Sequence, residues 1–140
     1  MKRIYEILEE CKLQENLDDV LRILKQNQSP ALKEVLRCAY HPNAEWYFKD
    51  WPKGYRKPDT LPGISQTNLY TEINRIYLFQ KGHPVADKMT QEKRNDLLVQ
   101  LLEGMEYDDS QVLIDIFNGD LQIQGLNKDM VNRVFPNLLP

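Results

Sequence analysis

The sequence predicts an all-α domain of seven or eight short helices. Apolar residues recur at spacings of three and four along most of the chain, and no segment keeps the two-residue alternation of a half-buried strand. The chain has 140 residues, of which 41% are hydrophobic and 28% are charged. These values fit one compact domain with one core, so we expect residues 1–140 to form a single domain.

Three helices are expected before residue 42. Asn16 can cap the second and Ser29 the third, because a short polar side chain accepts a hydrogen bond from a free first-turn amide. Pro30 suits the first position of the third helix, and His41-Pro42 should end it. The core-facing residues are Ile4, Ile7, Leu8 and Cys11; Leu17, Val20, Leu21 and Leu24; and Leu32, Val35, Leu36 and Ala39.

An aromatic segment follows the third helix: it opens at Asn43, carries Trp46-Tyr47-Phe48 and ends at Trp51-Pro52. Aromatic rings beside lysines can stack on single-stranded bases. Helical spacing favours instead that Trp46 and Tyr47 fill the core, with one ring exposed. The prolines and glycines of residues 52–67 predict a loop.

Four helices are expected after this loop. The first carries Leu69 and is stopped by Lys81-Gly82, and Thr90 caps the second. The third begins within residues 108–110 and closes at a glycine, and Asn127 caps the last. The core-facing residues are Leu69, Ile73, Ile76 and Tyr77; Leu97, Leu98, Leu101 and Leu102; Val112, Leu113, Ile116 and Phe117; and Met130, Val131 and Val134.

Charge is divided unevenly along the chain. Residues 1–94 carry 16 Lys or Arg against 13 Asp or Glu, whereas residues 95–140 carry 2 against 8. The net charge of −3 argues against tight general DNA binding, since phosphate neutralisation supplies most non-specific affinity. The local positive maximum is Lys49, Lys53, Arg56 and Lys57. The acidic stretch 96–120 is expected to be a solvated helix face.

Motifs of catalysis are absent from the sequence: it holds no nucleophile elbow, phosphate loop or dinucleotide fingerprint. Cys38-x-x-His41 has metal-like spacing, but a tetrahedral zinc site needs two more ligands, and only Cys11 and His83 could supply nitrogen or sulfur. We expect Cys38 to be a buried structural thiol and Asp108-Asp109 to cap a helix. No enzyme activity, metal or cofactor is expected.

The expected compartment is the cytoplasm. No run approaches the roughly 18 apolar residues of a membrane helix, and Glu6, Glu9 and Glu10 interrupt any export segment at the amino terminus. Two cysteines are too few for a disulfide framework, which favours a reducing interior.

Two loop-to-helix junctions, residues 62–67 and 124–128, could bind phosphate groups. In each, a glycine-containing turn precedes a helix, whose free amides and dipole favour an anion. The signal matters only if both junctions face the same way.

Four sequence blocks, spaced in order over nearly the whole chain, carry a family resemblance. They are Leu32–Val35 through Trp46–Pro52, Gly63-Ile64-x-x-Thr67-x-Leu69, Asp120–Ile123, and Asn132–Pro140. The chain resembles the N-terminal all-α DNA-binding domain of phage-type ATP-dependent DNA ligases. The resemblance implies a domain that grips the minor groove on both sides of a nick, through backbone groups and helix N-termini at two pseudo-symmetric loops.

The sequence also departs from that family. It stops at Pro140, where a ligase would continue into its nucleotidyltransferase domain, and it has no Lys-x-Asp-Gly sequence for lysine adenylation. Gly119 stands where ligases usually carry an arginine, and Gln124 lengthens the second loop by one residue. We therefore expect a stand-alone, non-enzymatic phage accessory protein of the host cytoplasm, without a nucleotidyltransferase domain.

The leading hypothesis is binding of duplex DNA, including nicked DNA, through backbone contacts. The candidate residues are Lys49, Lys53, Arg56, Lys57, Ser65, Thr67, Gly125, Asn127, Lys128 and Arg133. The alternative is a protein-interaction module of phage replication, repair or transcription, or an inhibitor of a host factor. Its contact surface would be Asp96, Glu103, Glu106, Asp108, Asp109 and Asp115.

Overall fold

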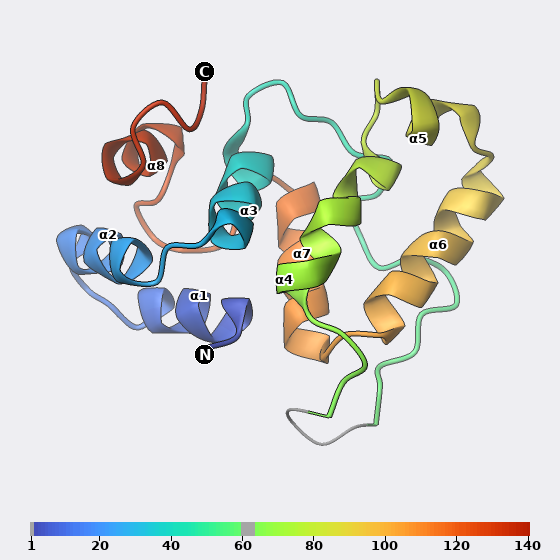
Figure 1. Ribbon diagram of the computed structural model, residues 1–140, viewed down its shortest axis with the longest axis horizontal. Coiled ribbons are helices and arrows are strands. Elements are labelled where there is room, and N and C mark those ends of the chain that lie inside the picture. Colours follow the sequence, from blue (N-terminus) through green and yellow to red (C-terminus); the bar gives the residue numbers. More distant parts are fainter. Residues whose placement is uncertain (1, 60–63) are drawn as a thin grey trace.

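The computed structural model describes residues 2–59 and 64–140, and its regular structure is helical (Figure 1). In chain order the helices are α1 (Ile4–Lys12), α2 (Leu17–Gln26), α3 (Pro30–Tyr40), α4 (Leu69–Glu72), the 3-10 helix η1 (Ile73–Phe79), α5 (Pro84–Lys88), α6 (Gln91–Glu103), α7 (Tyr107–Phe117) and α8 (Lys128–Val134). The described ranges contain no strand, so the predicted all-α fold is confirmed. None of their helices is both long enough and apolar enough to cross a bilayer.

Helix α7 forms the centre of the single domain. All residues from Val112 to Phe117 are buried, and α7 packs against α1, α3 and α6. Figure 1 shows α1, α2 and α8 on one side of α3 and α7, with α5 and α6 on the other. One core cluster runs through both sides and includes Leu24, Leu98 and Val131.

Four of the predicted helix caps are present. The side-chain oxygens of Asn16, Ser29, Thr90 and Asn127 each accept an amide hydrogen bond from the first turn of α2, α3, α6 and α8. Because each cap satisfies an otherwise free amide, each fixes where its helix begins. These four starts follow from local sequence alone.

The aromatic segment at 43–51 is not helical, so its expected helical spacing was wrong. Trp46 and Phe48 are buried and Tyr47 between them is half-buried, which is the alternation of a strand. The Tyr47 amide donates to the Phe79 carbonyl at 2.9 Å, where the segment pairs briefly with the end of η1. The prediction that Trp46 fills the core is confirmed.

The helix expected after the loop divides in two, and a short helix that was not predicted follows it. The α-helical hydrogen bonding of α4 changes to the tighter 3-10 pattern at Ile73. In α5, the His83 side chain accepts the Val85 amide at 3.2 Å and Pro84 fills the first position. This repeats the cap-and-proline start of α3, with histidine in place of serine.

Helix α7 begins at Tyr107, one to three residues earlier than predicted. Asp109 does not cap α7. Its carboxylate is only 1% exposed and accepts the amide of Leu69, the first residue of α4, at 3.1 Å. Burial raises the pKa of Asp109 to about 6.

The predicted acidic face, residues 96–120, is interrupted, because three of its seven carboxylates are buried. Glu106 lies 3.7 Å from the Arg3 guanidinium, and Asp115 accepts hydrogen bonds from two glutamine side chains. Buried charges need such partners. Of the proposed contact residues, the exposed ones are Asp96, Glu103 and Asp108.

Candidate nucleic-acid interface

The basic segment, defined as residues 49–57, carries four cations into solvent. Lys49, Lys53, Arg56 and Lys57 are all exposed. The segment runs beside α6 and α7 on the right-hand side of the molecule in Figure 1. These four predicted cations are therefore all accessible to a partner, whereas Lys128 and Arg133 lie on α8.

The main chain of the basic segment is fixed by three contacts from the neighbouring helices. The side-chain amide of Asn118 donates to the Lys49 carbonyl at 2.7 Å, and that of Asn95 donates to the Lys53 carbonyl at 2.8 Å. Glu103 accepts an amide hydrogen bond from the same segment at 3.2 Å. The backbone is held while the four charged side chains are exposed to solvent, an arrangement that lowers the ordering cost of binding an anionic partner.

Sequence reasoning missed Asn95 and Asn118, which hold the segment. Asn95 lies on α6 and Asn118 is the residue that ends α7, and their carbonyl partners are 42 and 69 residues away in the sequence. No local signal marks such a contact, because it exists only once α6 and α7 pack beside the segment.

A stack of aromatic rings supports the basic segment. The Trp51 ring stacks on Tyr55, with centroids 4.5 Å apart, and on Tyr107 at 5.1 Å. The Lys57 ammonium lies 4.5 Å from the Tyr107 centroid. Trp51 is therefore engaged within the protein, and the exposed stacking platform considered for single-stranded nucleic acid is not formed.

At the first junction the structure describes residues 64–67, while Pro62 and Gly63 lie outside the described residues. Both hydroxyls are used within the chain: Ser65 Oγ donates to the Thr67 carbonyl at 2.9 Å, and Thr67 Oγ1 to the buried Glu72 at 3.0 Å. A carboxylate thus occupies the neighbourhood expected to attract phosphate.

The first amides of α4 are also engaged. The Leu69 amide donates to Asp109, and the Thr71 amide donates to the Asn68 side chain at 3.4 Å. A phosphate at this junction would have to compete with these acceptors. The geometry therefore gives the first junction less support than the basic segment.

The second junction keeps the expected turn. Gly125 is exposed with a φ of +81°, a conformation that favours glycine. Asn127 caps α8 by accepting the Met130 amide at 3.0 Å, and Lys128 is half-buried at the first position of the helix. Arg133 is exposed, with its guanidinium 3.8 Å from the Asp18 carboxylate.

The two junctions lie in different parts of the molecule. Thr67 is joined to the turn between α6 and α7 through its amide and the Gly104 carbonyl, 3.0 Å apart. Gly125 instead lies beside Leu17 of α2. Figure 1 shows the chain entering α4 at the lower edge and α8 at the upper left.

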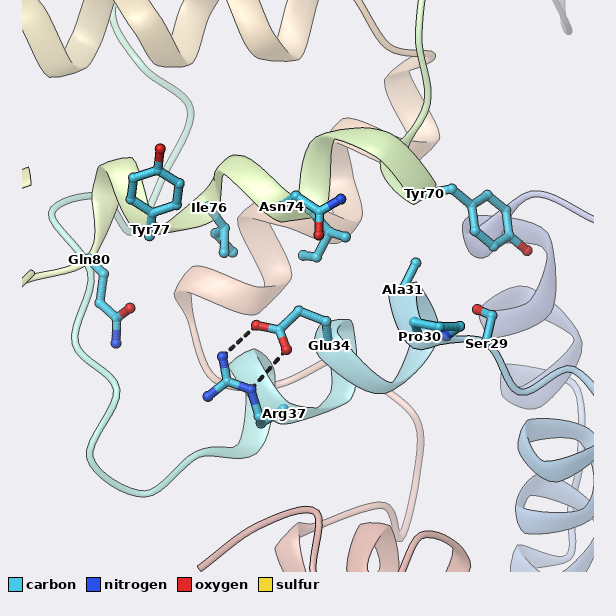
Figure 2. Close-up of a pocket in the computed structure, with 11 residues that line it drawn as sticks. Ser29, Pro30, Ala31, Glu34, Arg37, Tyr70, Asn74, Ile76, Tyr77 and Gln80 are labelled. Carbon is cyan, nitrogen blue, oxygen red and sulfur yellow. Dashed lines mark hydrogen bonds and ion pairs between the residues drawn. The ribbon is translucent and has the colours of Figure 1, made fainter. Parts of the chain in front are cut away.

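A cavity of about 520 Å³ lies elsewhere, between α3 and the α4–η1 helices (Figure 2). Glu34 and Arg37 form an ion pair in it, with Arg37 Nε 2.9 Å from Glu34 Oε2. None of the ten candidate DNA-binding residues lines it. The cavity is therefore not part of the predicted DNA-binding site.

Both cysteines are buried, as predicted for Cys38. Burial raises the pKa of the Cys11 thiol and that of the Cys38 thiol to about 12, so both are protonated at neutral pH. Within residues 2–59 and 64–140, no three His, Cys, Asp or Glu side chains are grouped so that they could hold a metal ion.

A family model matches residues 7–123, which is most of the chain. The chain belongs to a family of unknown function, DUF6433. This DUF6433 chain has no match among curated proteins.

Solved structures share the fold of this DUF6433 chain, and one of them is ligase-related by its name. It is named Pmar-Lig_PreS3, and it matches with a TM-score of 0.72 and 16% sequence identity. The match covers 100% of the DUF6433 chain but only 32% of the other chain. A likeness at this level of identity shows a common fold and leaves activity open.

Proposed function

We propose that this DUF6433 protein is a non-enzymatic phage accessory protein that binds the backbone of duplex DNA, including nicked DNA. The observation that carries the proposal is the basic segment, whose four cations are exposed on a backbone fixed by Asn95, Asn118 and Glu103. The all-α fold shared with a ligase-related chain supports the same reading. We place the function in the cytoplasm of the infected host.

Recognition would depend on charge and shape rather than base sequence. Lysine and arginine contacts to phosphates position a protein on a duplex and carry no sequence information directly. Lys128 and the exposed Arg133 of α8 would supply a second contact region. The net charge of −3 predicts modest affinity with a strong dependence on salt.

Charge reversal in the basic segment tests this function. We expect Lys53→Glu/Arg56→Glu/Lys57→Glu to abolish detectable duplex binding, measured by fluorescence anisotropy with a labelled duplex at low salt. The matched control is Lys12→Glu/Lys88→Glu/Lys93→Glu, which changes the net charge equally at other exposed positions. Circular dichroism checks that both variants fold.

Equal losses in the two variants would contradict the proposed footprint, because only net charge would then matter. Unchanged affinity in the first variant would contradict it as well. Absence of wild-type binding to any duplex would contradict DNA binding itself and favour the protein-interaction alternative, with Asp96, Glu103 and Asp108 as its exposed residues.

A further inference from the structure

Two lysines from different helices meet over one buried ring. The Lys25 ammonium of α2 lies 5.5 Å from the centroid of Phe135, and the Lys33 ammonium of α3 lies 5.3 Å from it. Phe135 follows α8 and is 4% exposed. The three helices α2, α3 and α8 thus bring two positive charges to the same side chain.

A cavity of about 280 Å³ opens at this place. Its lining residues are Lys25, Lys33, Phe135, Pro136, Asn137 and Leu138, and no carboxylate is among them. The lining is therefore cationic at two points and otherwise neutral.

The acidic residues nearby in the sequence already have cationic partners. Asp19 pairs with Arg22 at 2.9 Å, Asp18 with Arg133, and Glu34 with Arg37. In the part of the chain that the structure describes, neither Lys25 nor Lys33 has a carboxylate within ion-pair distance. Two positive charges therefore border one cavity, and no carboxylate of the described residues lies within ion-pair distance of either.

We propose that Lys25 and Lys33 form a phosphate-binding site at the end of α8. An anion between the two ammonium groups would relieve their mutual repulsion and gain two charge-assisted hydrogen bonds. The phosphate could belong to a nucleic-acid backbone or to a free phosphate compound. Of these two sources, only the duplex rests on the proposed function.

The test compares Lys25→Gln/Lys33→Gln with the control Lys12→Gln/Lys88→Gln. In the first arm, pyrophosphate is titrated into ¹⁵N-labelled protein. We expect the amide signals of Asn137 and Leu138 to shift in the wild type and the control but not in the Lys25/Lys33 variant. In the second arm, duplex affinity is measured against salt, where the loss of two phosphate contacts should reduce the slope by about two.

The two arms separate the outcomes. Amide shifts with pyrophosphate together with a reduced salt slope of duplex binding support a binding site for backbone phosphate. The same pyrophosphate shifts with an unchanged salt slope of duplex binding support a site for a free phosphate compound. The same shifts in a wild type that binds no duplex also support such a site, and this result contradicts only the proposed function. The proposed phosphate site is overturned if pyrophosphate does not shift the Asn137 and Leu138 signals of the wild type and if wild type and variant show the same salt slope of duplex binding.

Discussion

The Asp109 carboxylate and the Leu69 amide lie 3.1 Å apart and join the first turn of α7 to the start of α4. This contact spans 40 residues of sequence and is buried. It fixes the direction in which α4 leaves the first junction. It also places an ionisable group in the core, so the free energy of unfolding should depend on pH.

Stability should fall as pH rises between about 4 and 6. The pKa of Asp109 is raised to about 6 by burial, whereas an unfolded aspartate has a pKa of about 3.9. In that window the folded state binds more protons than the unfolded state, so raising the pH favours unfolding. The full loss is about 2–3 kcal/mol, at about 1.36 kcal/mol per pKa unit.

Asp109→Asn isolates this effect, because the amide oxygen can still accept the Leu69 hydrogen bond but cannot ionise. Urea unfolding of both proteins at pH 4, 5, 6 and 7 should show the wild type losing stability relative to the variant as pH rises. Parallel stability curves would contradict the assignment to Asp109.

Arg94 should be required to hold α5 in place. Its buried guanidinium donates to the carbonyls of Ala86 at 2.7 Å and Met89 at 2.6 Å and lies 3.7 Å from the Tyr47 ring centroid. We expect Arg94→Leu to lower the free energy of unfolding by about 2–4 kcal/mol, because two carbonyls lose their donor. Arg94→Lys should recover only part of this, since an ammonium cannot reproduce the planar fork.

Thermal and urea unfolding measure this loss. Arg22→Leu is the control, because Arg22 forms an exposed ion pair with Asp19 that should contribute less than about 1 kcal/mol. Equal effects of Arg94→Leu and Arg22→Leu would show that the three contacts of Arg94 add nothing.

The Trp51 stack should couple stability to DNA binding. Removing the ring by Trp51→Ala takes away contacts with Tyr55 and Tyr107, at a cost of about 2 kcal/mol or more. The same variant should bind duplex more weakly, because the basic segment loses its support. Trp51→Phe keeps an aromatic partner and should retain most of both properties. A folded Trp51→Ala protein with wild-type affinity would refute the coupling.

Gly125→Ala should destabilise the second junction through backbone conformation. The φ of +81° disfavours an alanine by about 1–2 kcal/mol. Its Cβ would meet Leu17 Cδ1 at 3.5 Å, an ordinary contact, so crowding adds little. Gly125→Asn should cost less, because asparagine tolerates this region better. Equal unfolding free energies for the two variants would argue against conformational strain.

Local features of the fold could be predicted from the sequence, and non-local ones could not. The caps at Asn16, Ser29 and Thr90 depend on residues within one helical turn, so they were predictable. The extended pairing of Tyr47 with Phe79 and the inward carboxylate of Asp109 depend on residues far away in the chain. Spacing alone could not distinguish an irregular segment from a helix at 43–51.

The candidate site also has features that could be predicted from local sequence and features that could not. The cations of the basic segment are adjacent in sequence, so a local charge count finds them. The meeting of Lys25 and Lys33 over Phe135 arises only when α2, α3 and α8 pack together. The burial of Glu106 and Asp115 has the same origin, which is why the predicted acidic face is smaller in the structure.

The most direct test of DNA binding is a titration of the wild-type protein with fluorescent nicked and intact duplexes at several salt concentrations. The proposal predicts binding that weakens with salt, with a slope that implies about three or more phosphate contacts. Tighter binding of the nicked duplex would add a preference for nicks. No binding to either duplex at low salt would contradict the proposal and show that this fold serves another partner.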